Sequence, residues 1–368
     1  MTRLHDLHQA HGQSPWLDNL RRGWITGGDL ARLIERGVRG ITSNPSIFQK
    51  AITDAADYDE QFADSLAGGS VEEAYWDLVT TDIDSALALL RPVFDESDGL
   101  DGYVSVEVAP SLARDTEGTL ASARELHERI DRPNLYVKIP GSVEGVPAIR
   151  QMIAEGRSIN VTLLFSLERY GDVIEAYMAG LEALAAAGGD LSKVSSVASF
   201  FVSRVDTEVD RRLDAVGTPE AQELKGRAAV ANAQLAYQLF LERFSGARWE
   251  ALAASGARVQ RPLWASTSTK DPALPDTLYV DRLIAPDTVN TMPEATLEAF
   301  ADHGTLARTA DADFDGAQAL VDRIGEVGVE MRDVTRVLEE EGVSAFEKSY
   351  DELLGALQAK ADALGSKG

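Results

Sequence analysis

NLYVKIPGS, at residues 134–142, is a short apolar run that contains a single lysine, Lys138. The neighbours of the lysine on both sides are apolar or aromatic, and a Pro-Gly pair closes the run. A run of this kind is typical of a strand that is buried on both faces in a parallel sheet. An ammonium group is costly to bury without a partner. A lysine in the middle of such a strand therefore needs either an acidic partner or a chemical role.

Seven further runs of this kind occur along the chain, with long amphipathic segments between them. Strands that alternate with helices predict a parallel sheet, and eight such units predict a closed (β/α)8 barrel, the TIM-barrel form of the α/β class. No Gly/Ser-rich or Pro-rich linker interrupts the chain, so we expect one barrel domain over residues 1–368. The eight predicted strands cover residues 14–20, 39–45, 103–109, 134–140, 158–165, 195–202, 261–267 and 287–293.

Three helical segments lie outside what a minimal barrel of about 250 residues needs. They are residues 46–90 after the second strand, residues 203–256 after the sixth strand, and residues 316–364 at the C-terminal end. The last segment is acidic and rich in alanine, and we expect it to form a helix on the surface.

Two of these segments contain clear helix starts. Ser70 and Glu73 form a capping box, which predicts a helix that begins at residue 71 and runs to residue 90. Thr218 and Pro219 are a typical N-cap and first helical residue, and they predict a second helix that continues through residue 244.

The composition excludes several classes of function. The 368 residues include 60 acidic and 35 basic ones, for a net charge of −25, and the basic clusters that bind nucleic acid do not occur. There is no cysteine, so disulfides and thiolate chemistry are excluded. No apolar run has the length of a membrane span, and the N-terminal residues lack the apolar region of a signal peptide. We therefore expect a cytoplasmic protein.

Three histidines near the N-terminus, His5, His8 and His11, invite comparison with a zinc site. Their spacing of three residues spreads them around a helix, and no acidic or cysteine ligands accompany them. We expect a solvated N-terminal helix and no metal site. Glycine-rich nucleotide-binding motifs are also absent.

Polar residues recur at the C-terminal ends of the predicted strands, where the active sites of (β/α)8 barrels form. A lone polar residue in such a place is most simply a cap or turn residue. The same pattern at seven of the eight strands, all facing one mouth, predicts a catalytic pocket. The polar residues in question are Asp18, Asn19, Thr42, Ser43, Asn44, Glu107, Lys138, Asn160, Thr162, Ser199, Arg204, Ser266, Thr267, Ser268, Thr269 and Lys270.

Lys138 has two interpretations from the residues alone. It can extend to solvent or pair with Glu107 as a structural ion pair. Alternatively, burial favours the neutral amine, which attacks a carbonyl carbon and forms a Schiff base. The protonated imine then withdraws electrons, so that a nearby carbon–carbon bond can break or form. This chemistry needs acid and base groups, and Glu107 and Asp18 are the candidate carboxylates.

The chain resembles the transaldolases, which are class I aldolase-type (β/α)8 barrels. It looks most like the longer bacterial branch seen in actinobacteria and cyanobacteria. The resemblance covers nearly the whole chain, and it is specific because several short motifs stand in the family's order. These motifs are WLDNLRR, GITSNPSIF, VSVEV, LYVKIPGS, INVTLLFS, SFFVSR and TVNTMP.

The resemblance implies a role for each catalytic residue. Lys138 matches the lysine that forms the Schiff base. Glu107 matches the glutamate that works through a water together with a threonine, here Thr162, to move protons while the imine forms. Asp18 matches the aspartate that takes the hydroxyl proton as the carbon–carbon bond breaks.

The resemblance also implies how the substrate is held. Asparagines hold the substrate hydroxyls, a serine and a phenylalanine line the pocket, and an arginine binds the phosphate. In this chain these residues are Asn44 and Asn160, Ser199 and Phe201, and Arg204.

One departure from the family concerns the phosphate. Shorter transaldolases carry a second phosphate-binding arginine in an A-S-F-R motif after the seventh strand. This chain has Ser266 at the serine of that motif and Ser268 at the arginine position, and Lys270 follows two residues later. The reaction class is unaffected, but the mode of phosphate recognition is in question.

The resemblance implies transfer of a dihydroxyacetone unit from sedoheptulose 7-phosphate to glyceraldehyde 3-phosphate, which gives erythrose 4-phosphate and fructose 6-phosphate. Small sugar phosphates are the expected partners, and no cofactor is expected. Whether the protein is a monomer or a homodimer is left open. Two alternatives remain: a fructose-6-phosphate aldolase-like lyase, which Glu107 disfavours because those relatives use a tyrosine in its place, and an inactive sugar-phosphate-binding barrel.

Overall fold

The computed structural model of the chain describes residues 2–365, apart from the side chains of residues 54 and 364. Within this range eight parallel strands form a closed barrel in chain order, with β8 paired to β1. The predicted barrel is therefore confirmed, and each strand overlaps its predicted range. The strands are β1 (Gln13–Asp18), β2 (Ile41–Thr42), β3 (Val104–Glu107), β4 (Leu135–Pro140), β5 (Ile159–Leu164), β6 (Ser196–Phe201), β7 (Arg261–Ala265) and β8 (Thr288–Met292).

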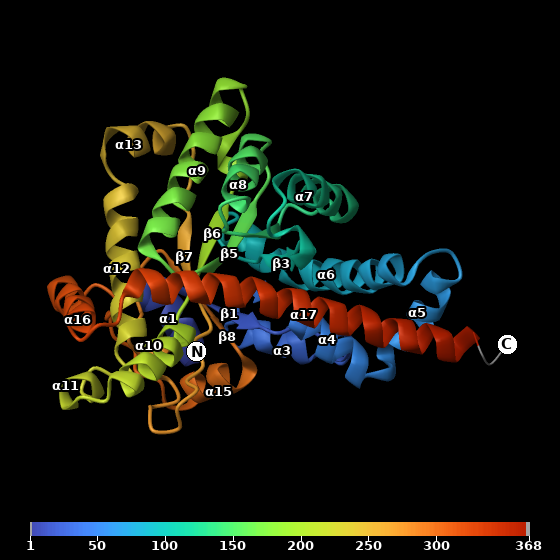
Figure 1. Cartoon of the computed structure of the whole chain (residues 1–368). Helices are drawn as coiled ribbons and strands as arrows, with labels where there is room; N and C mark the ends of the chain where they lie inside the picture. The colour runs from blue at the N-terminus through green and yellow to red at the C-terminus, as the bar shows by residue number, and fades with distance from the viewer. Residues whose placement is uncertain (1, 366–368) are drawn as a thin grey trace.

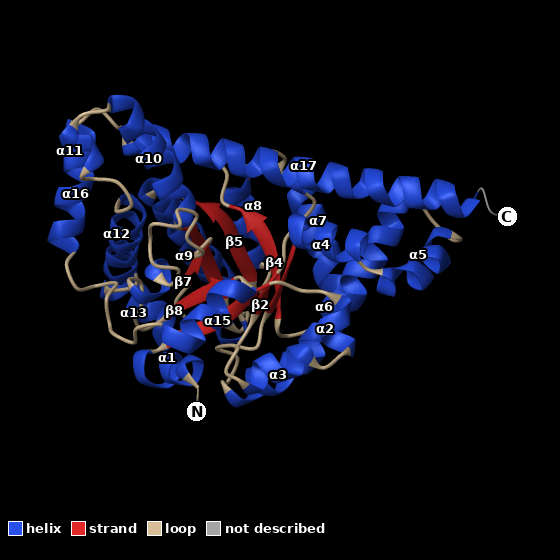
Figure 2. Ribbon diagram, turned by 90° about the horizontal axis from the view of Figure 1, so that it is seen from below, coloured by secondary structure: helices blue, strands red, loops and turns tan. Residues whose placement is uncertain are grey.

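Helices surround the barrel, which lies at the centre of the molecule (Figure 1, Figure 2). The three predicted extra segments are helical, as expected. None of the helices in residues 2–365 has the length and apolar character that crossing a membrane requires. The helices before β4 are α1 (Arg3–His11), α2 (Arg22–Thr26), α3 (Asp29–Glu35), α4 (Pro45–Asp54), η1 (Ala56–Tyr58), α5 (Asp59–Leu66), α6 (Val71–Glu96), η2 (Pro110–Leu112) and α7 (Thr116–Ile130). Those after β4 are α8 (Gly145–Ala154), α9 (Leu167–Ala186), η3 (Leu191–Lys193), α10 (Ser203–Val216), α11 (Pro219–Gln222), α12 (Ala228–Arg243), α13 (Gly246–Ala254), α14 (Leu278–Asp281), α15 (Glu294–His303), α16 (Phe314–Glu326) and α17 (Met331–Gly365).

Both predicted helix starts are confirmed, but the second helix does not continue as predicted. The capping box is confirmed, because Ser70 and Glu73 exchange hydrogen bonds at the start of α6. The long helix from Pro219 is wrong: Thr218 does cap its start, but α11 ends after four residues and α12 begins only at residue 228. Gly226 explains the break, since it has a positive φ of 67° and donates its backbone N–H to the carboxylate of Asp210. That contact stops the backbone from continuing as one helix.

The N-terminal end of the barrel is closed by a buried ion-pair network around Asp101, whose exposed fraction is 0%. The carboxylate accepts hydrogen bonds from Ser14 Oγ, Trp16 Nε1, Arg39 Nε and Arg261 Nη2, at 2.7 to 3.1 Å. Burial alone raises the pKa of a carboxyl group, but the charges of Arg261 and Arg39 outweigh burial here and lower the pKa of Asp101 to about 2. The network therefore keeps Asp101 ionised inside the protein.

Helix α1 packs under this end of the barrel, against β1 and α15. It carries His5, His8 and His11, as expected, but it is not simply solvated, because Leu4 and Leu7 are fully buried. These two leucines decide the position of the helix. Among the described residues, no group of three or more side chains is arranged as a metal site.

The C-terminal helix α17 is the main correction to the fold. We expected a surface helix, but α17 runs across the mouth of the barrel from α10 to α4, α5 and α6 (Figure 1, Figure 2). One side of the helix is buried through most of its length, so it is an integral layer of the fold. The buried apolar residues are Val334, Leu338, Val343, Phe346, Tyr350, Leu353, Leu357 and Ala361.

Candidate active site

Lys138 lies inside the barrel beside Glu107, because β3 and β4 are neighbours and their register places the two residues opposite each other. The Nζ atom of Lys138 is 3.1 Å from Oε2 of Glu107, and it donates a hydrogen bond of 3.2 Å to the carbonyl of Ser43. The side chains are only 5% and 3% exposed. The ion pair that we considered as an alternative is therefore present, and it holds the amine at a fixed position.

Glu107 retains hydrogen-bonding capacity despite its burial. Its Oε2 atom makes no hydrogen bond of good geometry with the described residues, and the same is true of the buried Oγ1 atom of Thr162 on β5. Burial raises the pKa of Glu107, and the positive charge of Lys138 opposes part of that increase. A carboxyl with a raised pKa that lies in contact with the amine can both accept and return a proton.

Asp18 is the last residue of β1. Two threonines, linked by hydrogen bonds, orient its carboxylate. Thr42 Oγ1 donates to Asp18 Oδ1 at 2.7 Å, and the Oγ1 atoms of Thr42 and Thr291 are 2.6 Å apart. Burial raises the pKa of Asp18, and the hydrogen bond from Thr42 partly offsets this increase. Sequence reasoning gave Thr42 only as one of many strand-end residues and did not single out Thr291, since neither carries a charge.

These side chains surround a cavity of about 180 Å³ at the C-terminal ends of the strands. The residues that we expected to act in catalysis or substrate binding all line it except Glu107 and Asn160, whereas four other strand-end residues, Asn19, Ser43, Thr267 and Thr269, do not. The lining consists of Asp18, Thr42, Asn44, Lys138, Thr162, Ser199, Phe201, Arg204, Ala265, Ser266, Ser268, Lys270, Thr291, Pro293 and Phe346.

The two predicted asparagines differ in their surroundings. Asn160 is fully buried and does not line the cavity; its amide donates to Ser105 Oγ at 3.0 Å and accepts from Ser199 Oγ at 2.7 Å. It therefore orients Ser199. Asn44 lines the cavity and also caps α4, where its Oδ1 accepts from the backbone N–H of Ile47. That bond leaves the amide N–H groups of Asn44 for a ligand.

Arg204 is placed to bind an anion. It lies in the first turn of α10, just after β6, and its guanidinium carbon is 5.0 Å from the centre of the Phe201 ring. Among the described residues, no carboxylate oxygen lies within 4.0 Å of its guanidinium nitrogens. Burial lowers the pKa of Arg204, against the charges of Asp18 and Glu107, but a guanidinium stays protonated in proteins. Both the free charge and the N-terminus of α10 favour a phosphate here.

The loop after β7 brings a second cation to the cavity. Lys270 Nζ donates to Ser268 Oγ at 2.8 Å, so the positive charge lies beside the position where shorter transaldolases have an arginine. Ser266 has a positive φ of 56° and its hydroxyl is 2.8 Å from that of Ser203, at the start of α10. The turn at Ser266 thus fixes this loop against α10, next to Arg204.

Phe346, from α17, completes the wall of the cavity and was missed from the sequence. Its helix is fixed over the mouth by a hydrogen bond of 2.7 Å between the hydroxyls of Ser46 and Ser349. A close approach contributes too, because a Cβ atom on Gly342 would lie 3.0 Å from Leu163 Cδ2 of β5. The spacing of apolar residues from 343 to 357, alternately three and four apart, is the pattern that could have revealed a packed helix face.

A buried lysine in a (β/α)8 barrel, with a glutamate in contact and an aspartate at the same mouth, defines an enzyme of the imine-forming aldolase type. Comparison with known proteins agrees with this class. A family model described as transaldolase/fructose-6-phosphate aldolase matches residues 15–357. The chain belongs to this transaldolase family.

The relatives are similar over almost their full length. A transaldolase from Thermobifida fusca (strain YX) is 57% identical over 354 residues, which is 95% of this chain and 96% of the relative. A transaldolase from Parafrankia sp. (strain EAN1pec) is 55% identical over 96% of this chain and 97% of its own length. One from Acidothermus cellulolyticus is 54% identical over 95% of this chain and 94% of its own length. All three of these relatives are named transaldolase.

Proposed function

We propose that this chain is a transaldolase that transfers a dihydroxyacetone unit from sedoheptulose 7-phosphate to glyceraldehyde 3-phosphate. The products are erythrose 4-phosphate and fructose 6-phosphate. The observation that carries the proposal is the contact of 3.1 Å between Lys138 Nζ and Glu107 Oε2, beside the cavity that Asp18 and Arg204 also line. The membership of the transaldolase family supports it.

The reaction starts when Lys138 passes a proton to Glu107 and the resulting amine attacks the carbonyl carbon of the donor. Glu107 moves the protons, together with Thr162 and a water, as the carbinolamine loses one water molecule and becomes an iminium. The contact between Glu107 and Lys138 supports this role, as does the buried hydroxyl of Thr162, which has no hydrogen-bond partner among the described residues. The iminium then serves as the electron sink, so the proposed reaction needs no metal or cofactor.

Carbon–carbon cleavage is the step that we assign to Asp18. Its carboxylate takes the proton of the hydroxyl on the carbon that becomes the aldehyde, while the bonding electrons move into the iminium and form an enamine on Lys138. The aldehyde product leaves. The enamine then attacks the aldehyde of the acceptor, Asp18 returns the proton to the new hydroxyl, and hydrolysis frees the lysine.

The remaining lining residues bind the sugar phosphate. We propose that Arg204 holds the phosphate and that Lys270, with Ser268, supplies a second contact. Asn44, Ser199, Phe201 and Ser266 line the path of the sugar chain. All of these residues come from one chain, so the site is compatible with either a monomer or a homodimer.

The rival function is that of a lyase which releases free dihydroxyacetone, since the family description includes fructose-6-phosphate aldolase. Glu107 favours transfer, because the fructose-6-phosphate aldolases have a tyrosine in place of this glutamate. Fructose 6-phosphate can be supplied with and without erythrose 4-phosphate as the acceptor. A transaldolase forms sedoheptulose 7-phosphate rapidly with the acceptor and releases little dihydroxyacetone without it.

The direct test is reduction with borohydride in the presence of fructose 6-phosphate, followed by peptide mass mapping. The adduct is expected on Lys138, with loss of turnover in Lys138→Ala and no rescue in Lys138→Arg, because a guanidinium stays protonated. Lys348→Ala, which removes a lysine side chain that is 77% exposed on α17, serves as the control and keeps full activity. An adduct on another lysine, or binding of sugar phosphate without any turnover, contradicts the proposal.

A further inference from the structure

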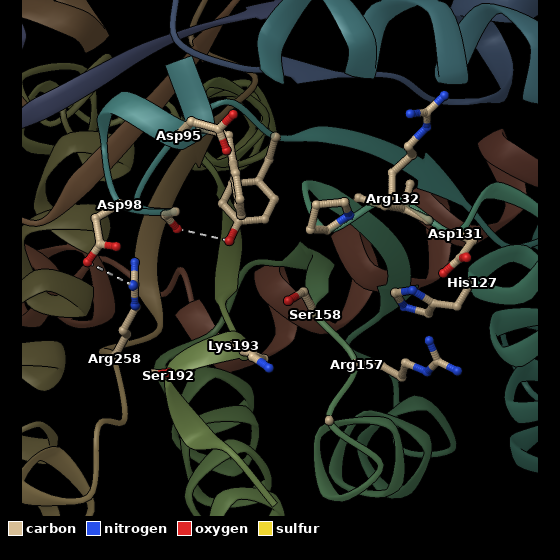
Figure 3. Close-up of a pocket in the computed structure, with 16 residues that line it drawn as sticks. Asp95, Asp98, His127, Asp131, Arg132, Arg157, Ser158, Ser192, Lys193 and Arg258 are labelled. Carbon is tan, nitrogen blue, oxygen red and sulfur yellow. Dashed lines mark hydrogen bonds and ion pairs between the residues drawn. The ribbon is translucent and has the colours of Figure 1, made fainter. Parts of the chain in front are cut away.

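A second cavity, of about 630 Å³, lies at the opposite end of the barrel from the catalytic one, and Figure 3 shows the residues that line it. Its walls come from segments that precede strands, such as Tyr103 before β3, Ser158 before β5 and Arg258 before β7. The catalytic residues lie at the other ends of the strands, about 20 Å away for a strand of six residues. A volume of this size is typical of sites for small molecules.

The cationic side chains that line this cavity outnumber its carboxylates by one, although the chain as a whole has a net charge of −25. Four cationic side chains and three carboxylates line it, and Figure 3 shows them arranged around the hollow. Since the long-range field of the protein repels anions, a site for an anion must rely on such a local group of cations. The cations are Arg132, Arg157, Lys193 and Arg258, and the carboxylates are Asp95, Asp98 and Asp131.

The cations differ in how far they are already paired. Arg132 is engaged by two hydrogen bonds to Asp84. Lys193 and Arg258 have only long ion pairs, of 3.7 and 3.5 Å, with exposed aspartates. The guanidinium of Arg157 forms no hydrogen bond or ion pair with any residue that the structure describes. Three of the four cations therefore have donors to offer to a ligand.

A buried imidazole in the wall points to the same conclusion. His127 is 6% exposed, and its Nε2 atom has no hydrogen-bond partner among the described residues. Burial, and to a lesser degree the charge of Arg157, lowers the pKa of His127 to about 4, so the ring is neutral near pH 7. A neutral imidazole has one donor and one acceptor nitrogen, which suits a ligand hydroxyl better than a second anionic group.

We infer that this cavity is a binding site for a hydroxylated phosphomonoester, whose phosphate contacts Arg157 and Lys193 and whose hydroxyl reaches His127, on the side of the hollow away from Arg258 (Figure 3). Guanidinium groups bind phosphate oxygens in pairs, and lysine adds a point charge. Sugar phosphates and nucleoside monophosphates share this chemistry. The inference does not depend on the reaction at the other end of the barrel, because no catalytic residue lines this cavity.

The binding test uses isothermal titration calorimetry with ribose 5-phosphate and with adenosine 5′-monophosphate. The protein carries Arg204→Ala in every sample, so that the phosphate anchor of the catalytic cavity is absent. At least one probe is expected to bind, and the one that binds more tightly identifies the ligand class. Arg157→Gln and Lys193→Gln, combined, are expected to weaken binding by roughly tenfold to a hundredfold, as loss of charged hydrogen bonds does.

Lys348→Gln is the matched control, since it removes one exposed positive charge from α17, at the mouth of the barrel. It should leave the binding of both probes unchanged. If neither probe binds, or if the double variant binds as tightly as its parent, the site does not exist. Equal weakening by Lys348→Gln would also overturn the inference, because the effect would then come from net charge alone.

A second measurement does not depend on the variants. In protein labelled with ¹⁵N in its histidines, the ring signals of His127 should shift when the probe is added, while those of His303, which is bonded to Asp276 and Asp302 at the surface, stay in place. An unchanged His127 signal at a saturating probe concentration contradicts the proposed contact.

Discussion

The Nζ atom of Lys138 and the Oε2 atom of Glu107 are 3.1 Å apart on neighbouring strands, and both side chains are almost wholly buried. The strand register alone brings them together. A buried ion pair of this kind adds little to stability, because desolvation offsets the attraction between the charges. In the proposed reaction its value is that it holds the amine and its proton acceptor at a fixed separation.

Glu107→Gln should slow imine formation by about 10²–10⁴-fold, the range for loss of one acid–base group. The amide keeps the shape of the side chain but cannot take the proton. Rapid mixing with fructose 6-phosphate, followed by borohydride trapping at set times, measures the rate of imine formation. A trapping rate equal to that of the parent protein would show that Glu107 is not the acid–base group of imine formation.

Asp18→Asn should allow the imine to form but block cleavage, with a loss of turnover of similar size, about 10²–10⁴-fold. The trapped adduct should then have the mass of the whole donor sugar phosphate rather than that of the three-carbon unit. Thr42→Val is a useful companion, since it removes the hydrogen bond to Asp18 while keeping the carboxylate. If Asp18→Asn accumulates only the three-carbon adduct, the assignment of the cleavage step is wrong.

Phosphate binding should divide unequally between Arg204 and Lys270. Contacts made equally in the ground and transition states raise KM when they are lost. Arg204→Ala should raise KM for fructose 6-phosphate strongly, and Lys270→Ala should raise it less, because Lys270 is exposed. Turnover of glyceraldehyde with dihydroxyacetone, neither of which has a phosphate, should change little. An unchanged KM for every phosphorylated substrate in Lys270→Ala shows that this lysine is not part of the site.

Phe346→Ala should reduce kcat/KM by about tenfold, which corresponds to about 1.4 kcal/mol of lost contact in the transition state. It should also increase release of free dihydroxyacetone, because water gains access to the enamine. Phe346→Leu is the matched control, since it retains most of the apolar wall. Transfer and release are assayed in parallel with both variants. If the ratio of release to transfer is unchanged in Phe346→Ala, Phe346 does not exclude water from the enamine.

Asp101→Asn should lower the free energy of unfolding by about 3–5 kcal/mol, because Arg39 and Arg261 lose their buried partner. Denaturation in urea measures this change. The pKa of Asp101 is lowered to about 2 in the folded protein, below that of the unfolded chain. Its contribution is therefore complete above about pH 4 and is lost as the pH falls towards about 2.

The acid sensitivity gives a control for this prediction. The difference in unfolding free energy between the parent and Asp101→Asn should shrink between about pH 4 and pH 2. Asp172→Asn, at an exposed aspartate paired with Arg169, should show only a small difference at any pH. A constant difference for Asp101→Asn across this range would contradict the role of its ionised form.

The barrel was predictable because eight short apolar runs alternate with amphipathic segments, and the site was predictable because seven of these runs end in polar residues. The placement of Lys138, Glu107 and Asp18 follows from strand order, since the C-terminal ends of the strands meet at one mouth. The orientation of Asn160 was not predictable. A residue on a strand can face a ligand or the layer below it, and only the packing of Ser105 and Ser199 decides between them.

Other features depended on contacts between distant segments. The threonine pair behind Asp18 joins β2 to β8, and nothing in either local sequence names the partner. The break at Gly226 depends on a hydrogen bond to Asp210, sixteen residues earlier. The path of α17 was the largest omission. Its apolar spacing indicates a packed face, but the surface that it packs against is set by the helices after β2 and β6.

The position of Phe346 has a consequence for how the protein is made. A ribosome synthesises all eight strands before it reaches α17, and domains begin to fold during synthesis. The barrel can therefore close, and Lys138 can meet Glu107, while the pocket still lacks the wall that Phe346 provides. In the proposed reaction, the nascent chain therefore has its amine in place before the pocket is complete, and full transfer activity is expected only after α17 has packed over the mouth.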